Sequence, residues 1–245
     1  MSQRLQRLRE KQRRLEQEER LKQKPLQLPN DPVAFCREVL NFHPFFYQET
    51  LLTDPSDRIA VRLCRQSGKT TTLGAIAIWY CATNPNKLVL IVAPDLRQSM
   101  VVMDRIEGHL ARIDSNILSK IIERQQRTKI QFTNGSMIIA LPCSENLLRG
   151  YTANLIIADE AAFFEHDEHM FNAVLLPMLF TTKGRMIISS TPWSSKSMFW
   201  RYTKGDLSTR FSQHHSGWEA LVQAGLITQQ QIEDFKASGE RAPFL

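Results

Sequence analysis

Residues 63–72, LCRQSGKTTT, contain the residue types of a phosphate-binding loop. Such a loop needs a lysine that reaches the β- and γ-phosphate oxygens, followed by a hydroxyl that holds Mg²⁺, and Lys69 and Thr70 supply these groups. The pattern GxxxxGK[ST] is incomplete, because Leu63 stands where its first glycine belongs. The sequence predicts a triphosphate site of unusual build rather than a structural turn. The backbone N–H groups expected around the phosphates belong to Gln66, Ser67, Gly68, Lys69 and Thr70.

Two adjacent carboxylates, Asp159 and Glu160, end the aliphatic run LIIADE further along the chain. Four apolar residues indicate a strand that crosses the core, and open α/β sheets bind their ligands at the carboxyl ends of such strands. Asp159 would hold a hydrated Mg²⁺, and Glu160 would polarise the attacking water. A pair of surface acids at a strand end is the alternative, and the upstream phosphate loop favours the catalytic pair.

Three hydroxyls, on Ser189, Ser190 and Thr191, end the next aliphatic run, GRMIISSTP. If the two strands are neighbours, these hydroxyls lie beside Asp159. They would then sense the γ-phosphate by hydrogen bonding and pass its loss to the following segment. Polar residues that simply end a strand before a proline are the alternative.

Gln48 lies among aromatic residues in the segment FHPFFYQE, upstream of the first predicted strand. An aromatic ring near a glutamine amide can stack on adenine and read its edge. Because aromatic residues beside a proline are more often part of a core, this signal is weak by itself.

The elements that would position these groups follow from hydrophobic periodicity. Strands of five to seven residues alternate with helices, which predicts a doubly wound, mainly parallel α/β sheet flanked by helices. An antiparallel hairpin is expected over 130–141, with its turn at Asn134 and Gly135. The other strands are predicted at 58–63, 87–94, 154–162 and 184–192, and helices after Gly68, around 102–113 and from a capping box at Thr228 and Gln231.

The net charge of +6 is concentrated at the N-terminus. Residues 1–24 contain nine Lys or Arg and four Glu, so the other 22 basic and 21 acidic residues nearly cancel. This division predicts a basic helical arm with a proline-containing linker over 1–30 and a folded domain over 31–245. The arm is either a solvated helical tail or a docking arm for DNA or a partner.

Cysteine usage argues against a disulfide-bonded secreted protein, and hydropathy argues against a membrane-spanning one. The four cysteines form no CxxC pair, which fits a reduced intracellular chain, and no apolar run approaches the ~18 residues of a membrane span. The sequence therefore predicts an intracellular protein without a membrane partner. The segment HDEH, with His166 and His169, is expected to be an exposed loop or helix start rather than a metal site.

YQ, RQSGKT, LIIADEAA and SSTP, in this order and spacing, resemble the ATPase domain of viral terminase large subunits, the motors that package DNA into procapsids. The resemblance covers about residues 35–245, and its motifs are jointly specific. Phosphate loops of this family typically lack the first glycine, so Leu63 matches a family trait. The resemblance implies an α/β P-loop NTPase of the RecA-like class, with ATP as substrate and Mg²⁺ as cofactor.

The resemblance also assigns roles by position. It implies that Gln48 contacts adenine, that Lys69 and Thr70 bind phosphate and Mg²⁺, that Asp159 binds the metal, that Glu160 is the catalytic glutamate, and that coupling runs through Ser189, Ser190 and Thr191. Arg65 matches an arginine proposed to act on the γ-phosphate within the same subunit. Arg149 lies where some members place an arginine offered to the neighbouring subunit, and the sequence leaves the choice between the two open.

The implied partners are double-stranded DNA, other copies of the chain in a ring, the portal protein and the small terminase subunit, in the cytoplasm of an infected cell. Family members normally continue into a ribonuclease-H-like nuclease domain, for which no length remains, so no nuclease activity is expected from this chain. The alternatives are a helicase-like DNA-dependent ATPase, which usually brings a second similar domain, and a non-catalytic nucleotide-binding assembly module. Because the body is nearly neutral, DNA contact would come from a local basic cluster, from the N-terminal arm or from the summed electrostatic field of a ring of subunits.

Overall fold

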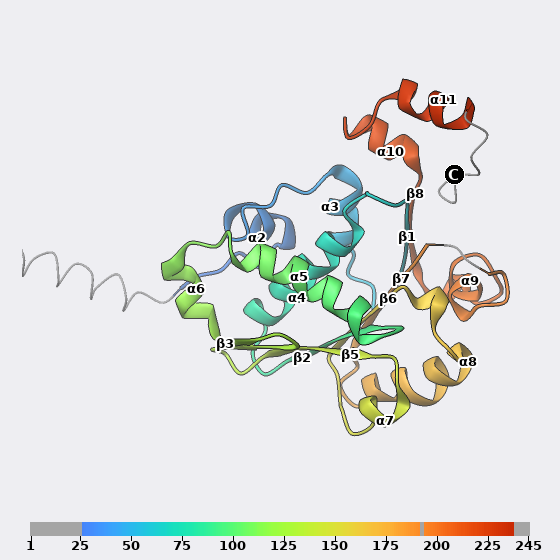
Figure 1. Cartoon of the computed structure of the whole chain (residues 1–245). Helices are drawn as coiled ribbons and strands as arrows, with labels where there is room; N and C mark the ends of the chain where they lie inside the picture. The colour runs from blue at the N-terminus through green and yellow to red at the C-terminus, as the bar shows by residue number, and fades with distance from the viewer. Residues whose placement is uncertain (1–25, 192–193, 238–245) are drawn as a thin grey trace, which may run out of the picture.

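The computed structural model describes residues 26–191 and 194–237, which build an eight-stranded sheet with helices on both faces (Figure 1). The strand order is β3-β4-β5-β2-β6-β7-β1-β8. The six strands from β5 to β8 run parallel, while β4 pairs antiparallel with β5 and β3. The strands are β1 Arg58–Leu63, β2 Leu88–Ala93, β3 Ile122–Gln126, β4 Lys129–Phe132, β5 Met137–Pro142, β6 Leu155–Asp159, β7 Arg185–Ser189 and β8 Ser212–Ser216.

Both faces of the sheet are buried, which explains the continuous aliphatic runs in the sequence. In β2, Val89 and Ile91 belong to one core, and Leu90 and Val92 belong to the other. Successive side chains of a strand point to opposite faces, so a strand covered on both sides needs apolar residues throughout. The predicted α/β fold with a mainly parallel central sheet is confirmed.

Two groups of helices cover the two faces (Figure 1). The first face is covered by α2 Pro32–Glu38, α3 Phe46–Thr53, α4 Lys69–Thr83, α5 Leu96–Leu110, α6 Ser115–Ile121 and α10 Trp218–Gln223. The second is covered by α7 Glu145–Leu148, η1 Ala161–Phe163, the π-helical η2 Met170–Leu175, η3 Pro177–Leu179 and α9 Met198–Thr203. The remaining short elements are α8 Asp167–His169, η4 Ser208–Arg210 and α11 Gln229–Ala237.

Local signals in the sequence place several boundaries correctly. Asp31 caps α2, since its Oδ1 accepts a hydrogen bond from Ala34 N at 2.7 Å. The hairpin forms between β4 and β5, and Gly135 in its turn takes a φ of +84°. Thr228 and Gln231 form the predicted capping box before α11. The predicted arm and linker span residues 1–30, of which residues 1–25 lie outside the described residues, so the division at residue 30 stays a prediction.

Two strands, β3 and β8, were not predicted, because both are polar. The residues of β8, SQHHS, lack the aliphatic pattern of a central strand. Among the described residues this strand forms the edge of the sheet and pairs with β1, and none of its side chains is fully buried, so polar residues are tolerated there. In the described part of the chain, no helix is both long and apolar enough to span a membrane.

The carboxylate of Asp54 fixes β8 to the segment before β1. His214 Nε2 lies 2.7 Å from Asp54 Oδ2, and the Ser56 N–H donates to Oδ1 at 2.8 Å. Burial raises the pKa of Asp54, but hydrogen bonds from Ser212, Ser56 and His214 outweigh it and hold the pKa well below 3.8. The ionised form is therefore the one that stabilises the fold.

Replacing Asp54 by Asn is expected to lower the free energy of unfolding by about 2 kcal/mol at neutral pH. Because the folded pKa lies below the unfolded value of 3.8, the advantage of the natural chain is complete above that pH and declines as the pH falls toward the folded pKa. Urea unfolding between neutral and acid pH measures this difference. The exposed Asp57→Asn variant is the control, and an equal loss in both variants would contradict the assignment.

Candidate nucleotide-binding site

The predicted phosphate loop connects the end of β1 to the start of α4. Gly68 takes a φ of +73°, and a Cβ at this position would lie 2.6 Å from Gln48 Nε2. The backbone angle therefore favours glycine, and a Cβ here would also have to displace the Gln48 amide. Leu63, at the position of the absent first glycine, is still part of β1 and is buried, so the chain turns only after it.

Two side chains of α3 hold the peptide bond between Ser67 and Gly68. The Tyr47 hydroxyl donates to the Ser67 carbonyl oxygen at 3.0 Å, and Gln48 Nε2 donates to the same oxygen at 2.9 Å. In a trans peptide the carbonyl and the next N–H point in opposite directions. Because the carbonyl is held toward α3, the N–H of Gly68 points away from α3, and Gly68 lines the cavity.

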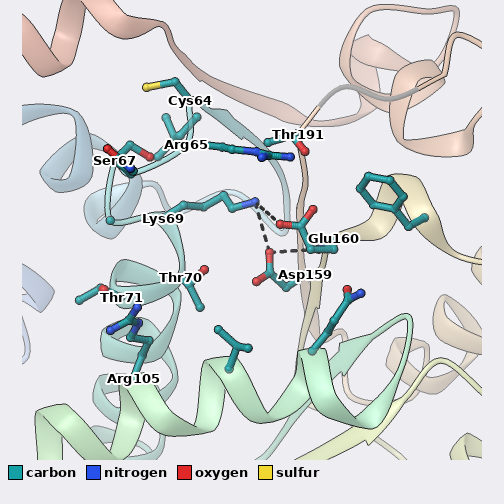
Figure 2. A pocket seen from close by; sticks show the side chains of 16 residues that line it. Cys64, Arg65, Ser67, Lys69, Thr70, Thr71, Arg105, Asp159, Glu160 and Thr191 are labelled. Carbon is teal, nitrogen blue, oxygen red and sulfur yellow. Dashed lines mark hydrogen bonds and ion pairs between the residues drawn. The ribbon is translucent and has the colours of Figure 1, made fainter. Parts of the chain in front are cut away.

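A cavity of about 590 Å³ lies beside this loop, at the carboxyl ends of β1 and β6 (Figure 2). This is the edge at which open α/β sheets bind ligands. The loop, the first turn of α4, one side of α5 and the segments after β6 and β7 form its walls. Among the predicted site residues, it is lined by Arg65, Gln66, Ser67, Gly68, Lys69, Thr70, Asp159, Glu160 and Thr191.

The structure brings the lysine and both carboxylates together in this cavity (Figure 2). Lys69 Nζ lies 3.1 Å from Glu160 Oε1 and 3.5 Å from Asp159 Oδ1. The Lys69 and Asp159 side chains are almost buried, whereas 32% of the Glu160 side chain is exposed. The two carboxylates compensate the charge of Lys69, and the phosphates of a bound triphosphate would compete with them for this lysine.

Glu160 has an unusual backbone conformation. Its φ is +52°, in the left-handed region, which costs a residue with a side chain on the order of 1 to 3 kcal/mol. The hydrogen bond from Glu160 N to Asp159 Oδ1 at 3.0 Å supports this turn. The Ser190 hydroxyl also donates to Glu160 Oε2 at 3.2 Å. Such strain is concentrated at functional sites, and here it directs the carboxylate into the cavity.

The hydroxyl segment, residues 189–191, lies where the sequence predicts it, because β6 and β7 are neighbours and Asp159 pairs with Ser189. Thr191 lines the cavity, and Ser190 contacts Glu160. Ser189 is buried, and its Oγ has no hydrogen-bond partner in the part of the chain that the structure describes. A role of these residues in coupling stays a prediction.

The two candidate arginines lie in different places. Arg65 extends from the phosphate loop along the cavity toward Thr191 (Figure 2). Arg149 directly follows α7, outside the cavity, with 70% of its side chain exposed and its guanidinium donating to Glu145 Oε1 at 2.6 Å. Only Arg65 can therefore reach a ligand in this cavity without a large movement.

Gln48 lies behind the loop rather than in the cavity. It is buried, and its Oε1 accepts a hydrogen bond from Phe45 N at 2.9 Å while its Nε2 donates to Ser67. The adenine contact stays a prediction. It requires the Gln48 amide to break one of these two hydrogen bonds and form one with adenine.

We expect Gln48→Ala to weaken the binding of ATP and GTP alike, by about tenfold, because a buried hydrogen bond to the loop is lost. Tyr47→Phe removes the other bond to the same carbonyl and is the matched control, with an equal effect on both nucleotides. Competition of each nucleotide against a fluorescent analogue gives both affinities. A selective loss of ATP over GTP in Gln48→Ala alone would instead establish the adenine contact.

The segment HDEH is an exposed helix start, as predicted: α8 covers Asp167–His169, and His169 Nε2 lies 3.2 Å from Glu145 on the surface. Sequence reasoning missed one wall of the cavity, formed by α5 and η1. Val101 is an apolar residue of α5 that departs from the buried stripe and is 45% exposed, but Leu96 shares this property without lining the cavity, so the sequence pattern does not identify the wall. The residues that line the cavity from this wall are Gln98, Val101, Arg105 and Phe163.

The residues present fit a magnesium ion. The Thr70 hydroxyl and the Asp159 carboxylate line the same cavity from the loop side and the β6 side. Mg²⁺ prefers oxygen ligands and is usually bound by one or two carboxylates together with phosphate oxygens and water. The donor set therefore suits a Mg²⁺ that accompanies a bound triphosphate.

Several solved structures with the same fold are large terminase proteins of bacteriophages. A mutant ATPase domain of the large terminase of Thermus phage P74-26 superposes with a TM-score of 0.67 at 20% identity, covering 77% of this chain and 87% of that one. The HK97 large terminase gives 0.62 at 12% identity, with 78% and 44% coverage. The large terminase of a thermophilic bacteriophage, in complex with ADP, gives 0.55 at 12% identity, with 78% and 49% coverage. The chain thus spans less than half of the last two proteins.

A family model provides a match at the level of sequence. The model is described as the N-terminal part of the terminase large subunit, T4likevirus-type, and it matches residues 63–241. The matched region begins at the end of β1 and includes the phosphate loop, both carboxylates and the hydroxyl segment. Because the match covers well over half of the sequence, the chain belongs to the terminase large subunit family.

Proposed function

We propose that this chain is the ATP-hydrolysing motor domain of a terminase large subunit and powers the translocation of double-stranded viral DNA into a procapsid. The observation that carries the proposal is the convergence of Lys69 with Asp159 and Glu160 in one cavity beside the phosphate loop. Structures of the thermophilic bacteriophage's large terminase in complex with ADP and with ATP-γ-S support a nucleotide as the ligand.

The chemistry follows from the groups that the cavity brings together. Lys69 forms an ion pair with Glu160 in the structure. When ATP binds, the lysine would pair with phosphate oxygens instead. Glu160 would then be released to accept a proton from the attacking water, and the Ser190 hydroxyl would keep its carboxylate oriented. Mg²⁺, held by Thr70 and Asp159, would neutralise charge on the phosphates. Arg65 would stabilise the charge that develops on the γ-phosphate.

Movement would begin at the end of β7. Ser190 contacts Glu160, and Thr191 lines the cavity, so both lie within reach of changes around the γ-phosphate. Loss of this group would shift the segment that leads to α9 and to a surface that holds DNA. The partners proposed with this role are double-stranded DNA, other copies of the chain in a ring, the portal protein and the small terminase subunit, in the cytoplasm of the infected cell.

The decisive experiment is a phosphate-release assay on the complete gene product, with and without duplex DNA. We expect Mg²⁺-dependent ATP hydrolysis that duplex DNA stimulates. The absence of hydrolysis under both conditions would leave a non-catalytic nucleotide-binding assembly module. Duplex unwinding by the same preparation would identify a helicase-like enzyme instead.

A further inference from the structure

A second cavity, of about 210 Å³, lies between β1 and α9 on the second face of the sheet. Its cationic lining residues are Arg62 and Lys204, and Ser195 and Trp200 also contribute to its wall. A volume this small, below that of most small-molecule pockets, suits a single charged group rather than a whole nucleotide. Neither ATP binding nor hydrolysis accounts for this cavity.

Arg62 is the residue of β1 just before Leu63. Its neighbours Val61 and Leu63 belong to the first core, so the alternation of the strand places Arg62 on the opposite face, with α9. Arg62 Nε is buried without a hydrogen-bond partner in the described residues, and burial lowers the pKa of this guanidinium. Buried polar groups are normally paired, so a buried, unpaired Nε on a guanidinium that lines a cavity suits an anionic ligand there.

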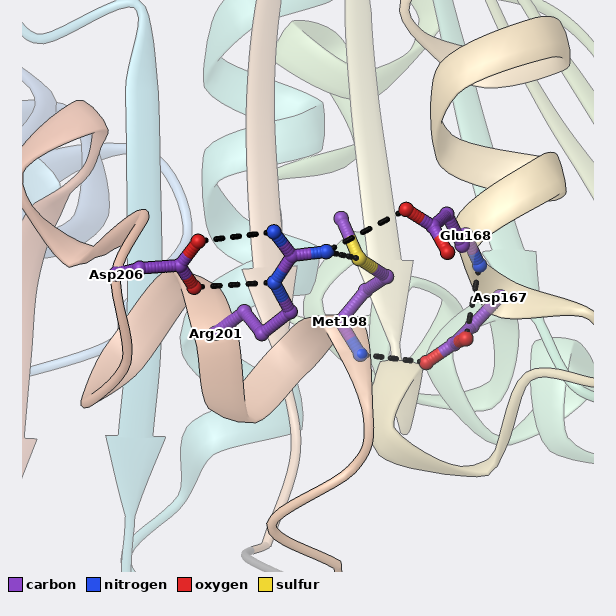
Figure 3. A network of polar contacts seen from close by, with 5 residues as sticks. All are labelled: Asp167, Glu168, Met198, Arg201 and Asp206. Carbon is purple, nitrogen blue, oxygen red and sulfur yellow. Dashed lines mark hydrogen bonds and ion pairs between the residues drawn. The ribbon is translucent and has the colours of Figure 1, made fainter.

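The other arginine of this region already has its partners (Figure 3). Arg201 in α9 donates to both carboxylate oxygens of Asp206, at 3.0 and 2.9 Å, and to Glu168 at 3.4 Å. Met198 N also donates to Asp167 Oδ2 at 2.6 Å, which ties the start of α9 to α8. The network therefore fixes α9 while neutralising Arg201.

Lys204 directly follows α9 and is exposed, and it forms no ion pair among the described residues. Its charge adds to that of Arg62 at the edge of the sheet, where His215 pairs with Arg62 in β8. Burial lowers the pKa of His215, and Arg62 and Lys204 lower it further, while Glu219 acts in the opposite direction. The lining of the cavity thus carries two cationic side chains and no carboxylate among the described residues.

We propose that Arg62 and Lys204 bind a phosphate group of the DNA backbone in this cavity, an inference that rests on the proposed function. Paired cations recognise phosphate oxygens strongly, and the half-exposed Trp200 at the wall can pack against the adjoining sugar. The position also matters for coupling. Arg62 directly precedes Leu63, and the other wall begins at Ser194, soon after Thr191 in the sequence; Leu63 and Thr191 both line the ATP site. A DNA phosphate in the second cavity would therefore contact residues that adjoin, along the chain, two segments of the ATP site.

The test is the salt dependence of duplex DNA binding by the full chain, measured by fluorescence anisotropy between about 50 and 200 mM salt. The slope of log K against log salt reports the number of phosphates contacted, at about 0.9 per phosphate. The double variant Arg62→Gln/Lys204→Gln should give a slope shallower by about 0.9. The matched control, Lys87→Gln/Lys183→Gln, removes two charges at the amino ends of the parallel strands and should keep the natural slope.

Lys204→Gln alone, at an exposed position, guards against misfolding of the double variant and should also make the slope shallower. An unchanged slope in both variants overturns the proposal, as does a natural chain that does not bind DNA. Inorganic phosphate that raises the melting temperature of the natural chain but not of the double variant, with equal DNA slopes, would assign the cavity to free phosphate and overturn the DNA contact. Phosphate release without DNA is measured in parallel, so the proposed ATPase activity is tested independently of the DNA contact.

Discussion

Glu160→Gln is expected to lower ATP turnover by about 10²- to 10⁴-fold while ATP binding is retained. The amide keeps the shape of the carboxylate and its bond to Ser190, but it cannot accept a proton from water. Loss of the negative charge also removes one partner of Lys69, so the lysine is held less firmly by the protein when a triphosphate arrives. Binding should therefore be as tight as in the natural chain or slightly tighter.

The measurement combines phosphate release with the binding of a fluorescent ATP analogue. Glu165→Gln is the matched control, because this nearby residue is exposed and lies outside the cavity, and we expect its turnover to be unchanged. Undiminished hydrolysis by Glu160→Gln would refute the role of this carboxylate as the base. Loss of binding in the same variant would show that the residue is needed to build the site.

Arg65→Ala is expected to reduce turnover by about 10³- to 10⁵-fold, the range seen when an arginine that stabilises the transferred phosphate is removed. The expectation rests on its position, because Arg65 lines the cavity and Arg149 does not. Arg149→Ala removes the same charge from an exposed site and should retain turnover within about threefold, since it breaks only a surface ion pair.

Mixing inactive chains decides which subunit supplies the arginine. A mixture of Arg65→Ala with Glu160→Gln should remain inactive if Arg65 acts on the ATP bound by its own subunit, because neither chain then has a complete site. If Arg149→Ala proves inactive by itself and regains activity when mixed with Glu160→Gln, the arginine comes from a neighbouring subunit. That result would overturn the assignment of Arg65.

The predicted site residues that the structure brings together are those that lie at or just beyond the ends of aliphatic strands. Parallel strands end at a common edge, so Lys69, Asp159 and Ser190 had to approach one another once the strands were recognised. The two hydrogen bonds from α3 to the loop carbonyl could not be read, because they depend on how α3 packs against the loop. The α5 wall of the cavity was equally hidden, since the periodicity of an amphipathic helix identifies its buried stripe and not what its other side faces.

The position of β8 has a mechanical consequence. This edge strand runs parallel to β1, and its last residue, Ser216, accepts a hydrogen bond from Cys64 N at the very start of the phosphate loop. A load applied along the polypeptide after β8 would act in shear on the whole ladder between the two strands, so its hydrogen bonds would have to yield together rather than one by one. Tension on the polypeptide beyond β8 would thus be transmitted to the phosphate loop with little deformation of the strands between them.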